Sequence, residues 1–179
     1  MRSVASTRRA VLVLVLGLSL GLGLTGCSSP TQEARSLAIA ALRDEYATLK
    51  SVTQDLASTS TSPAHALSRA EQGDLGIVWP NPVDNGTDVS APTFRTIFDM
   101  SADSTSIQFS SALEAKGETG GGFTSGQASV YLCVHVSETV PSSSAPIVRV
   151  VKCRADISSL LKSRSENELV GFSMIERQQ

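Results

Sequence analysis

The stretch PTQEARSLAIAALRDEYATLKSVTQDL, residues 30–56, decides the fold class, because it carries a long helical pattern. Apolar side chains recur in it every three or four positions, at Ala38, Ile39, Leu42, Tyr46, Leu49, Val52 and Leu56. Charged and polar residues such as Arg43, Lys50 and Gln54 take the opposite side. This spacing places one apolar stripe along an α-helix. We therefore predict a long helix that packs on a sheet of the same domain.

The boundaries of this helix and of a second one are marked by capping residues. Ser29 precedes Pro30 and stands three residues before Gln32, an arrangement typical of a helix start. A Ser/Thr linker covers residues 58–62, and Pro63 then begins a shorter helix that Gly73 is expected to end. The predicted order is thus a long helix followed by a short one.

Beyond Pro92 the apolar residues change to a period of two, which is typical of strands. The positions that alternate toward one face are Phe94, Thr96, Phe98 and Met100, and then Ile107, Phe109, Ser111 and Leu113. Asp103 and Ser104 can make the turn between these two strands. We predict an antiparallel hairpin with one apolar face, followed by a loop over the glycine-rich residues 116–126.

A further strand is predicted over residues 128–136, with two distinct faces. One face carries Val130, Leu132, Val134 and Val136, and the other carries Tyr131, Cys133 and His135. A returning strand over residues 147–154 can place Cys153 opposite Cys133, His135 opposite Val151 and Val136 opposite Val150. Cysteines can also bridge elements that are not neighbours, so this pairing is one of the allowed arrangements.

The carboxyl-terminal part is predicted to add one short helix and one strand. Residues 156–162 suit a helix of one or two turns, with Ile157, Leu160 and Leu161 inward. Residues 169–175 form the expected last strand, with Val170, Phe172 and Met174 on its buried face.

The predicted fold is of the α+β class. A long amino-terminal helix and a short helix pack on an antiparallel sheet of five or six strands. The order of elements, helices first and a meandering sheet second, resembles the cone-shaped nuclear-transport-factor-like fold. That resemblance implies a fold that often encloses a pocket, and it carries no function by itself.

The first 26 residues have the three parts of an export signal. Arg2, Arg8 and Arg9 form a basic start, residues 10–24 form an apolar run, and small residues follow. The run is shorter than the roughly 20 residues that a membrane-spanning helix needs. The motif Thr7-Arg8-Arg9 also looks like a twin-arginine signal, so the general secretory and twin-arginine export routes both stay open.

The run ends in Leu24-Thr25-Gly26-Cys27, which resembles the lipobox of bacterial lipoproteins. The resemblance covers only the first 27 residues. It implies that residues 1–26 are a lipoprotein signal peptide and that the Cys27 thiol receives a diacylglycerol. It also implies further acylation of the new amine, with chains such as palmitate. Residues 27–179 are then a single extracytoplasmic domain held at the cell membrane by lipid on Cys27.

The charge balance excludes several classes of partner. The first 26 residues contain three arginines and no acid, so the remainder carries 12 basic and 17 acidic residues, a net charge near −5. Nucleic acids and anionic lipid surfaces both require a basic face, so neither is an expected partner. Arginine outnumbers lysine by 11 to 4, a usage that resembles high-GC Gram-positive bacteria.

Few residues qualify as a functional site. Once Cys27 is assigned to lipid, Cys133 and Cys153 are left as an expected disulfide, because exported thiols oxidise. The candidate ligand contacts are Tyr131, His135 and Trp79. No metal site or cofactor is predicted, and Asp84, Asn85 and Asp88 suit a turn better than a calcium loop, since the order of ligands is wrong.

These observations favour a non-enzymatic envelope lipoprotein, acting as a binding or accessory module of unknown ligand. One alternative is a small surface hydrolase, for which His65 and His135 are the only histidines that could serve as a base. A second alternative is the solute-binding subunit of a transporter, although such proteins usually need two lobes around a cleft.

Overall fold

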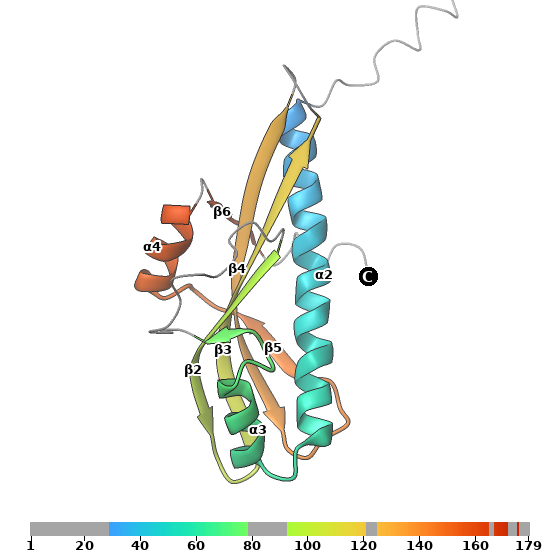
Figure 1. Cartoon of the computed structure of the whole chain (residues 1–179), viewed down its shortest axis with the longest axis vertical. Helices are drawn as coiled ribbons and strands as arrows, with labels where there is room; N and C mark the ends of the chain where they lie inside the picture. Colours follow the sequence, from blue (N-terminus) through green and yellow to red (C-terminus); the bar gives the residue numbers. More distant parts are fainter. Residues whose placement is uncertain (1–28, 79–92, 121–124, 165–166, 172–174, 176–179) are drawn as a thin grey trace, which may run out of the picture.

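A computed structural model describes residues 29–78, 93–120, 125–164, 167–171 and 175 of the 179-residue chain. Its elements are α2 (Pro30–Thr59), α3 (Pro63–Glu71), β1 (Ile77–Val78), β2 (Thr93–Ala102), β3 (Ser106–Thr119), β4 (Gly126–Thr139), β5 (Ile147–Val150), α4 (Ala155–Arg164) and β6 (Asn167–Leu169). The described elements are three helices packed on a six-stranded sheet, so the α+β class is confirmed (Figure 1).

The long helix begins where its capping residues predict. Ser29 is the N-cap of α2, and its Oγ accepts a hydrogen bond from the Gln32 amide at 3.3 Å. The predicted stripe is buried, with Ala38, Leu42, Tyr46, Leu49 and Leu56 in the main core. Ser62 caps α3 in the same way through the His65 amide, and the chain turns at Gly73 with φ of +102°. The hydrophobic spacing and the cap Ser29 therefore located α2, and Pro63 with Gly73 located α3.

Helix α2 runs the whole length of the β3–β4 hairpin. It has 30 residues, and β3 and β4 have 14 each. At 1.5 Å per helical residue and about 3.3 Å per strand residue, both elements are about 45 Å long. The matched lengths give the molecule its elongated shape, with the start of α2 and the tip of the hairpin at the same end (Figure 1).

The sheet is mixed rather than purely antiparallel. The order is β1-β2-β3-β4-β5, with β1 parallel to β2, and the β2–β3, β3–β4 and β4–β5 pairs antiparallel. Strand β6 pairs with β4 in parallel, opposite residues 129–131. This last strand lies at residues 167–169 and not at the predicted 169–175, of which Phe172 and Met174 lie outside the described residues.

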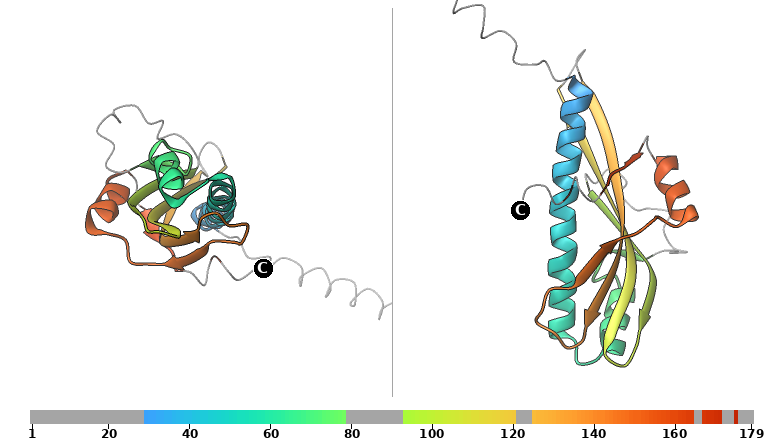
Figure 2. Two further views of the ribbon diagram at one scale, coloured as in Figure 1. Left: turned by 90° about the horizontal axis from the view of Figure 1, so that it is seen from below. Right: turned by 180° about the vertical axis from the view of Figure 1, so that it is seen from behind.

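Helices cover both faces of the sheet. The prediction that the β2–β3 hairpin has only one apolar face was therefore wrong. The inner face packs on α2 and α3 and holds the main core, which includes Ile97, Ile107, Phe109 and Leu113. The outer face holds a smaller cluster under α4, on the far side of the sheet from α2 (Figure 2). The two faces of β4 divide as predicted, because Val130, Leu132, Val134 and Val136 join the inner core while Tyr131 and Cys133 join the outer cluster.

A β-bulge explains why the alternation in β2 was misassigned. The register with β3 shifts between Phe98 and Ser101, and Asp99 has a φ of +53°. An extra residue reverses which face the following side chains occupy. Phe98 therefore belongs to the outer cluster, whereas Met100 packs against the inner core.

Both ends of the glycine-rich segment belong to strands rather than to the predicted loop. Strand β3 extends to Thr119, β4 begins at Gly126, and residues 121–124 lie outside the described residues. A Cβ added at Gly117 would lie 2.0 Å from the carbonyl oxygen of Ala34, and one at Gly126 would lie 2.3 Å from the carbonyl carbon of Pro30. These two glycines let the hairpin approach the backbone of α2, and Thr119 Oγ1 donates to the Pro30 carbonyl at 2.8 Å.

We predict that Gly117→Ala lowers the free energy of unfolding by about 1–3 kcal/mol, because the methyl group would overpack the helix backbone. For a domain of this size the melting temperature should fall by about 3–10 °C. Gly171→Ala is the matched control, since no atom of the described residues lies within 4 Å of a Cβ there. Equal melting temperatures for the two variants, measured by circular dichroism, would contradict the close approach.

Candidate functional site

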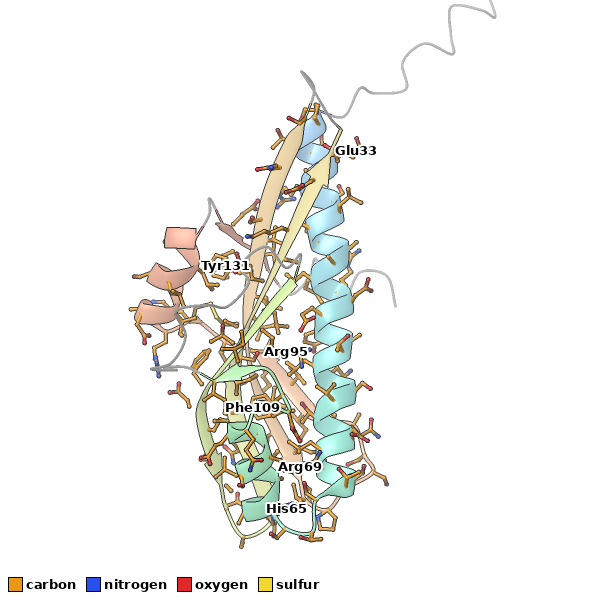
Figure 3. The ribbon with its side chains drawn as sticks, in the orientation of Figure 1. Glu33, His65, Arg69, Arg95, Phe109 and Tyr131 are labelled. Carbon is orange, nitrogen blue, oxygen red and sulfur yellow. A yellow bond between two sulfur atoms is a disulfide. The ribbon has the colours of Figure 1, made fainter. Side chains whose placement is uncertain are left out.

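The candidate contacts Tyr131 and His135 lie on the outer face of β4, on either side of Cys133. Tyr131 is buried in the outer cluster with Phe98, Ala112, Cys133, Cys153, Ile157 and Leu161. Figure 3 shows Tyr131 on the side of the sheet where α4 lies. Packing under α4 thus accounts for the burial of Tyr131.

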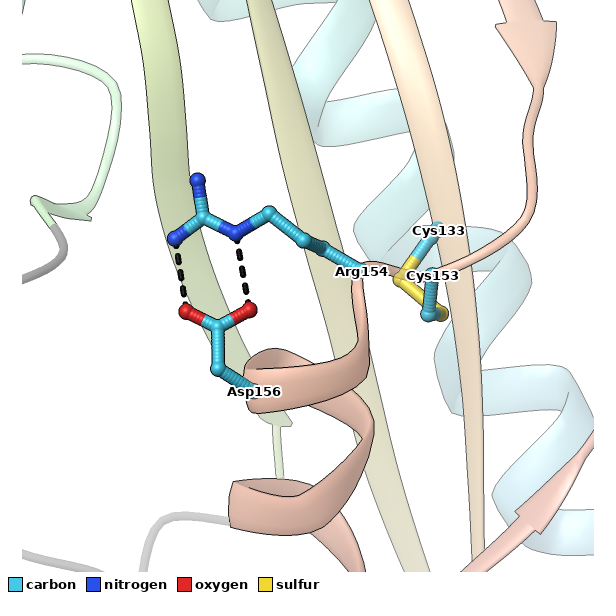
Figure 4. The surroundings of a disulfide bond; sticks show 4 residues. All are labelled: Cys133, Cys153, Arg154 and Asp156. Atoms are coloured by element: carbon cyan, nitrogen blue, oxygen red, sulfur yellow. Dashed lines mark hydrogen bonds and ion pairs between the residues drawn. A yellow bond between two sulfur atoms is a disulfide. The ribbon is translucent and has the colours of Figure 1, made fainter.

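Cys133 and Cys153 form a disulfide with a Cα–Cα distance of 5.2 Å (Figure 4). The predicted strand register was wrong by two residues, because His135 lies opposite Arg149 and Val136 lies opposite Val148. The β5 strand ends at Val150, and Cys153 reaches Cys133 after the chain has left the ladder. Closing a chain segment of 20 residues stabilises a fold by about 3 kcal/mol in the chain-entropy model.

An arginine just after the disulfide holds the start of α4 against the sheet. Arg154 donates to both carboxylate oxygens of Asp156, at 2.7 and 2.8 Å, and also pairs with Asp99 at the bulge. Its guanidinium lies 5.2 Å from the centre of the Phe98 ring. The hydrogen bonds from Arg154 lower the pKa of Asp156 to about 2. Figure 4 shows the Arg154–Asp156 pair directly after the disulfide. The disulfide and the pair of Arg154 with Asp99 thereby hold the same short segment.

His135 lies on the part of the outer face that α4 leaves partly exposed. Its Nδ1 is 3.4 Å from the Oγ of Ser110, its neighbour on β3, and Arg149 of β5 lies on its other side. Among the hydrogen bonds of the described residues, none joins His135 to a carboxylate. A serine nucleophile needs a base that is itself oriented by a third group. The described contacts therefore bring together Ser110 and His135, a serine and a base, but no third group that orients the base.

The two histidines lie on opposite sides of the sheet. His65 is exposed in the first turn of α3, and its Nδ1 accepts a hydrogen bond from the Thr61 amide at 3.3 Å. Helix α3 packs on the inner face through Ala66 and Ala70, whereas His135 is on the outer face with Ser110. The two side chains cannot act on one substrate atom in this fold.

Several predicted sites lie outside the described residues. These are Cys27, Trp79 and the turn with Asp84, Asn85 and Asp88. Within the residues that the structure describes, no group of three or more His, Cys, Asp or Glu side chains is placed to hold a metal ion. No helix among the described residues is long and apolar enough to cross a membrane.

Sequence reasoning missed two buried acids, Glu114 and Glu138. Glu138 lies on the inner side of β4 opposite Ile107, is only 3 % exposed, and its Oε2 has no hydrogen-bond partner among the described residues. Burial raises its pKa, while hydrogen bonds with Ser142 and the Thr139 backbone oppose this shift. An acid that continues the apolar alternation of Val134 and Val136 was the available signal, because that position must face the core.

No family model, curated protein or solved structure matches this chain. The likeness to the nuclear-transport-factor-like cone accordingly rests on the order of elements alone.

We predict that Glu138→Gln makes the protein more stable than the native form at alkaline pH, with a difference that shrinks toward pH 4. Burial raises the folded-state pKa of Glu138 above its unfolded value, so the bound proton stabilises the folded state. This stabilisation is complete below the unfolded pKa and is lost as the pH rises through the folded pKa. Melting temperatures from pH 4 to 9 would show it, and a pH-independent difference between the two proteins would contradict it.

Proposed function

We propose that this chain is a lipid-anchored cell-envelope lipoprotein whose extracytoplasmic domain is a non-enzymatic binding or accessory module. The motif Leu24-Thr25-Gly26-Cys27, directly after an apolar run with a basic start, carries the proposal. Two or more acyl chains on Cys27 would anchor the protein stably, without a polybasic segment. The net charge near −5 of residues 27–179 agrees with anchoring by lipid rather than by attraction to anionic headgroups.

The fold supports this proposal through the position of α2. Its N-cap, Ser29, is two residues after Cys27, so almost no tether separates the lipid from the helix. With Cys27 in the membrane surface, the domain would stand on the end where α2 meets the hairpin tip. The turn between β2 and β3, at the other end, would lie about 45 Å from the bilayer.

The geometry gives less support to the two alternatives. His65 lies on the other side of the sheet from His135. A histidine-dependent hydrolase would therefore have to use His135, which has no carboxylate hydrogen-bond partner among the described residues. A solute-binding subunit needs two lobes, whereas the described strands belong to one sheet. A binding or accessory role is the function that these contacts favour.

We predict that Cys27→Ser abolishes incorporation of labelled palmitate and moves the protein from the membrane to the soluble fraction. The serine hydroxyl lacks the thiolate nucleophilicity that lipid transfer to Cys27 requires. Cys133→Ser is the matched control, because it removes a different cysteine and should leave labelling intact. The proposal fails if the Cys27 variant still carries label, or if the native protein carries none.

A further inference from the structure

Strands β5 and β6 lie end to end along one edge of β4. Strand β3 pairs with β4 over its full length, so β5, opposite residues 134–137, and β6, opposite residues 129–131, both occupy the other edge. Within the part of the chain that the structure describes, no strand pairs with the outward side of β5. The sheet therefore ends in an exposed edge on this side, which we name the β5 edge (residues 147–150).

The backbone of the β5 edge presents hydrogen-bonding groups outward. The Val151 amide donates to the Cys133 carbonyl at 3.0 Å, which makes this pair a hydrogen-bonded one. Hydrogen-bonded and non-hydrogen-bonded pairs alternate along an antiparallel ladder. Val148 and Val150, opposite Val136 and Val134, are consequently non-hydrogen-bonded pairs whose N–H and C=O groups point away from β4.

Exposed apolar side chains gather along this side of the sheet. The described residues include four exposed large apolar side chains, and three of them are here: Ile147 at 60 %, Val150 at 37 % and Leu169 of β6 at 54 %. The fourth, Leu37, is on α2. An exposed edge with apolar side chains is the kind of surface that accepts another strand, and proteins otherwise protect it.

The charge on this edge is opposite to that of the domain as a whole. Arg149 and Lys152 are exposed on β5 and just after it, in a domain whose net charge is near −5. Glu168 of β6 is occupied by Arg35, at 2.6 and 2.7 Å. The edge thus offers positive charge to an incoming chain, and it matches an acidic segment better than a second copy that carries the same Arg149.

Covalent and ionic contacts hold the chain just after the β5 edge. The Cys133–Cys153 disulfide lies three residues after the end of β5, and Arg154 pairs with Asp99 and Asp156. A preformed template lowers the ordering cost that binding must overcome.

We propose that the β5 edge binds an extended, acidic segment of another envelope protein as an additional β-strand. The main-chain groups of Val148 and Val150 would supply the hydrogen bonds, and Arg149 with Lys152 would select acidic side chains. The proposal rests on the proposed function only for the compartment in which the partner is found.

The probe for this test is the photoreactive analogue benzoylphenylalanine, placed at position 147 of the full-length protein in its own cells. Position 64, exposed on α3, is the control. We expect illumination to give adducts at position 147 at a yield about tenfold above position 64. Mass spectrometry of the joined peptide should identify a segment of another protein with a surplus of Asp and Glu.

Two pairs of variants separate the contributions of charge and backbone. Arg149→Glu should lower the adduct yield about tenfold, because like charges repel, while Arg149→Lys should keep it. Val150→Pro removes an outward N–H and should lower the yield similarly, while Val150→Ala, which keeps the N–H, should not. Melting temperatures within about 2 °C of the native protein would show that these exposed substitutions leave the fold intact.

Four results would each overturn the proposal: equal yields at positions 147 and 64, an adduct with a second copy of this chain, a neutral or basic partner segment, or no effect of Arg149→Glu and Val150→Pro. Flotation of the same samples with membranes tests the lipid anchor separately. Adducts from protein that does not float with membranes would contradict the lipid anchor and leave the β5 edge supported.

Discussion

The contact on which the rest of this structure depends is the close packing of α2 along the β3–β4 hairpin. The helix and the two strands have the same length, and the apolar stripe from Ala34 to Ala57 covers the inner face of both strands. At one end Gly117 and Gly126 bring the two backbones together. Farther along, Arg95 of β2 pairs with Glu45 at 2.6 Å and donates to the Leu75 carbonyl, which joins β2 and the segment after α3 to the helix. Breaking a partly buried ion pair leaves an uncompensated charge. The Arg95–Glu45 pair therefore also fixes the position of β2 on the helix.

Much of the fold follows from local patterns, and the exceptions have identifiable physical causes. The cap Ser29, the start of α3 at Pro63 and the stripe of α2 depend on neighbours along the chain, so the sequence predicts them well. The turn at Asp103 is local too, because its carboxylate accepts from the amides of Thr105 and Ser106, which helps to lower its pKa to about 2. The bulge at Asp99 and the role of Gly117 depend instead on how distant segments meet. A period of two cannot reveal an inserted residue, and a glycine selected for close packing looks the same as one selected for a turn.

The candidate site was predictable only in part. The alternation in β4 separated the two faces correctly and placed Tyr131, Cys133 and His135 together, but it could not show that α4 would bury Tyr131 and leave His135 partly exposed. The buried Glu138 is visible in the same alternation once the strand is extended to Thr139. The exposed β5 edge could not be derived from sequence, because it depends on which strand ends the sheet. What connects these features is the disulfide, which lies between the end of β5 and the start of α4 and belongs to the outer cluster.

The measurement that tests the account most directly is the distance of each end of the domain from the membrane. Spin labels at position 118, near the hairpin tip, and at position 104, in the turn between β2 and β3, would be compared in vesicles containing the full-length lipidated protein, using a relaxing agent held at the bilayer surface. If Cys27 anchors the end where α2 meets the hairpin, the label at position 118 is strongly relaxed and the one at position 104, about 45 Å away, is not. Equal relaxation of the two labels, or stronger relaxation at position 104, would contradict this orientation.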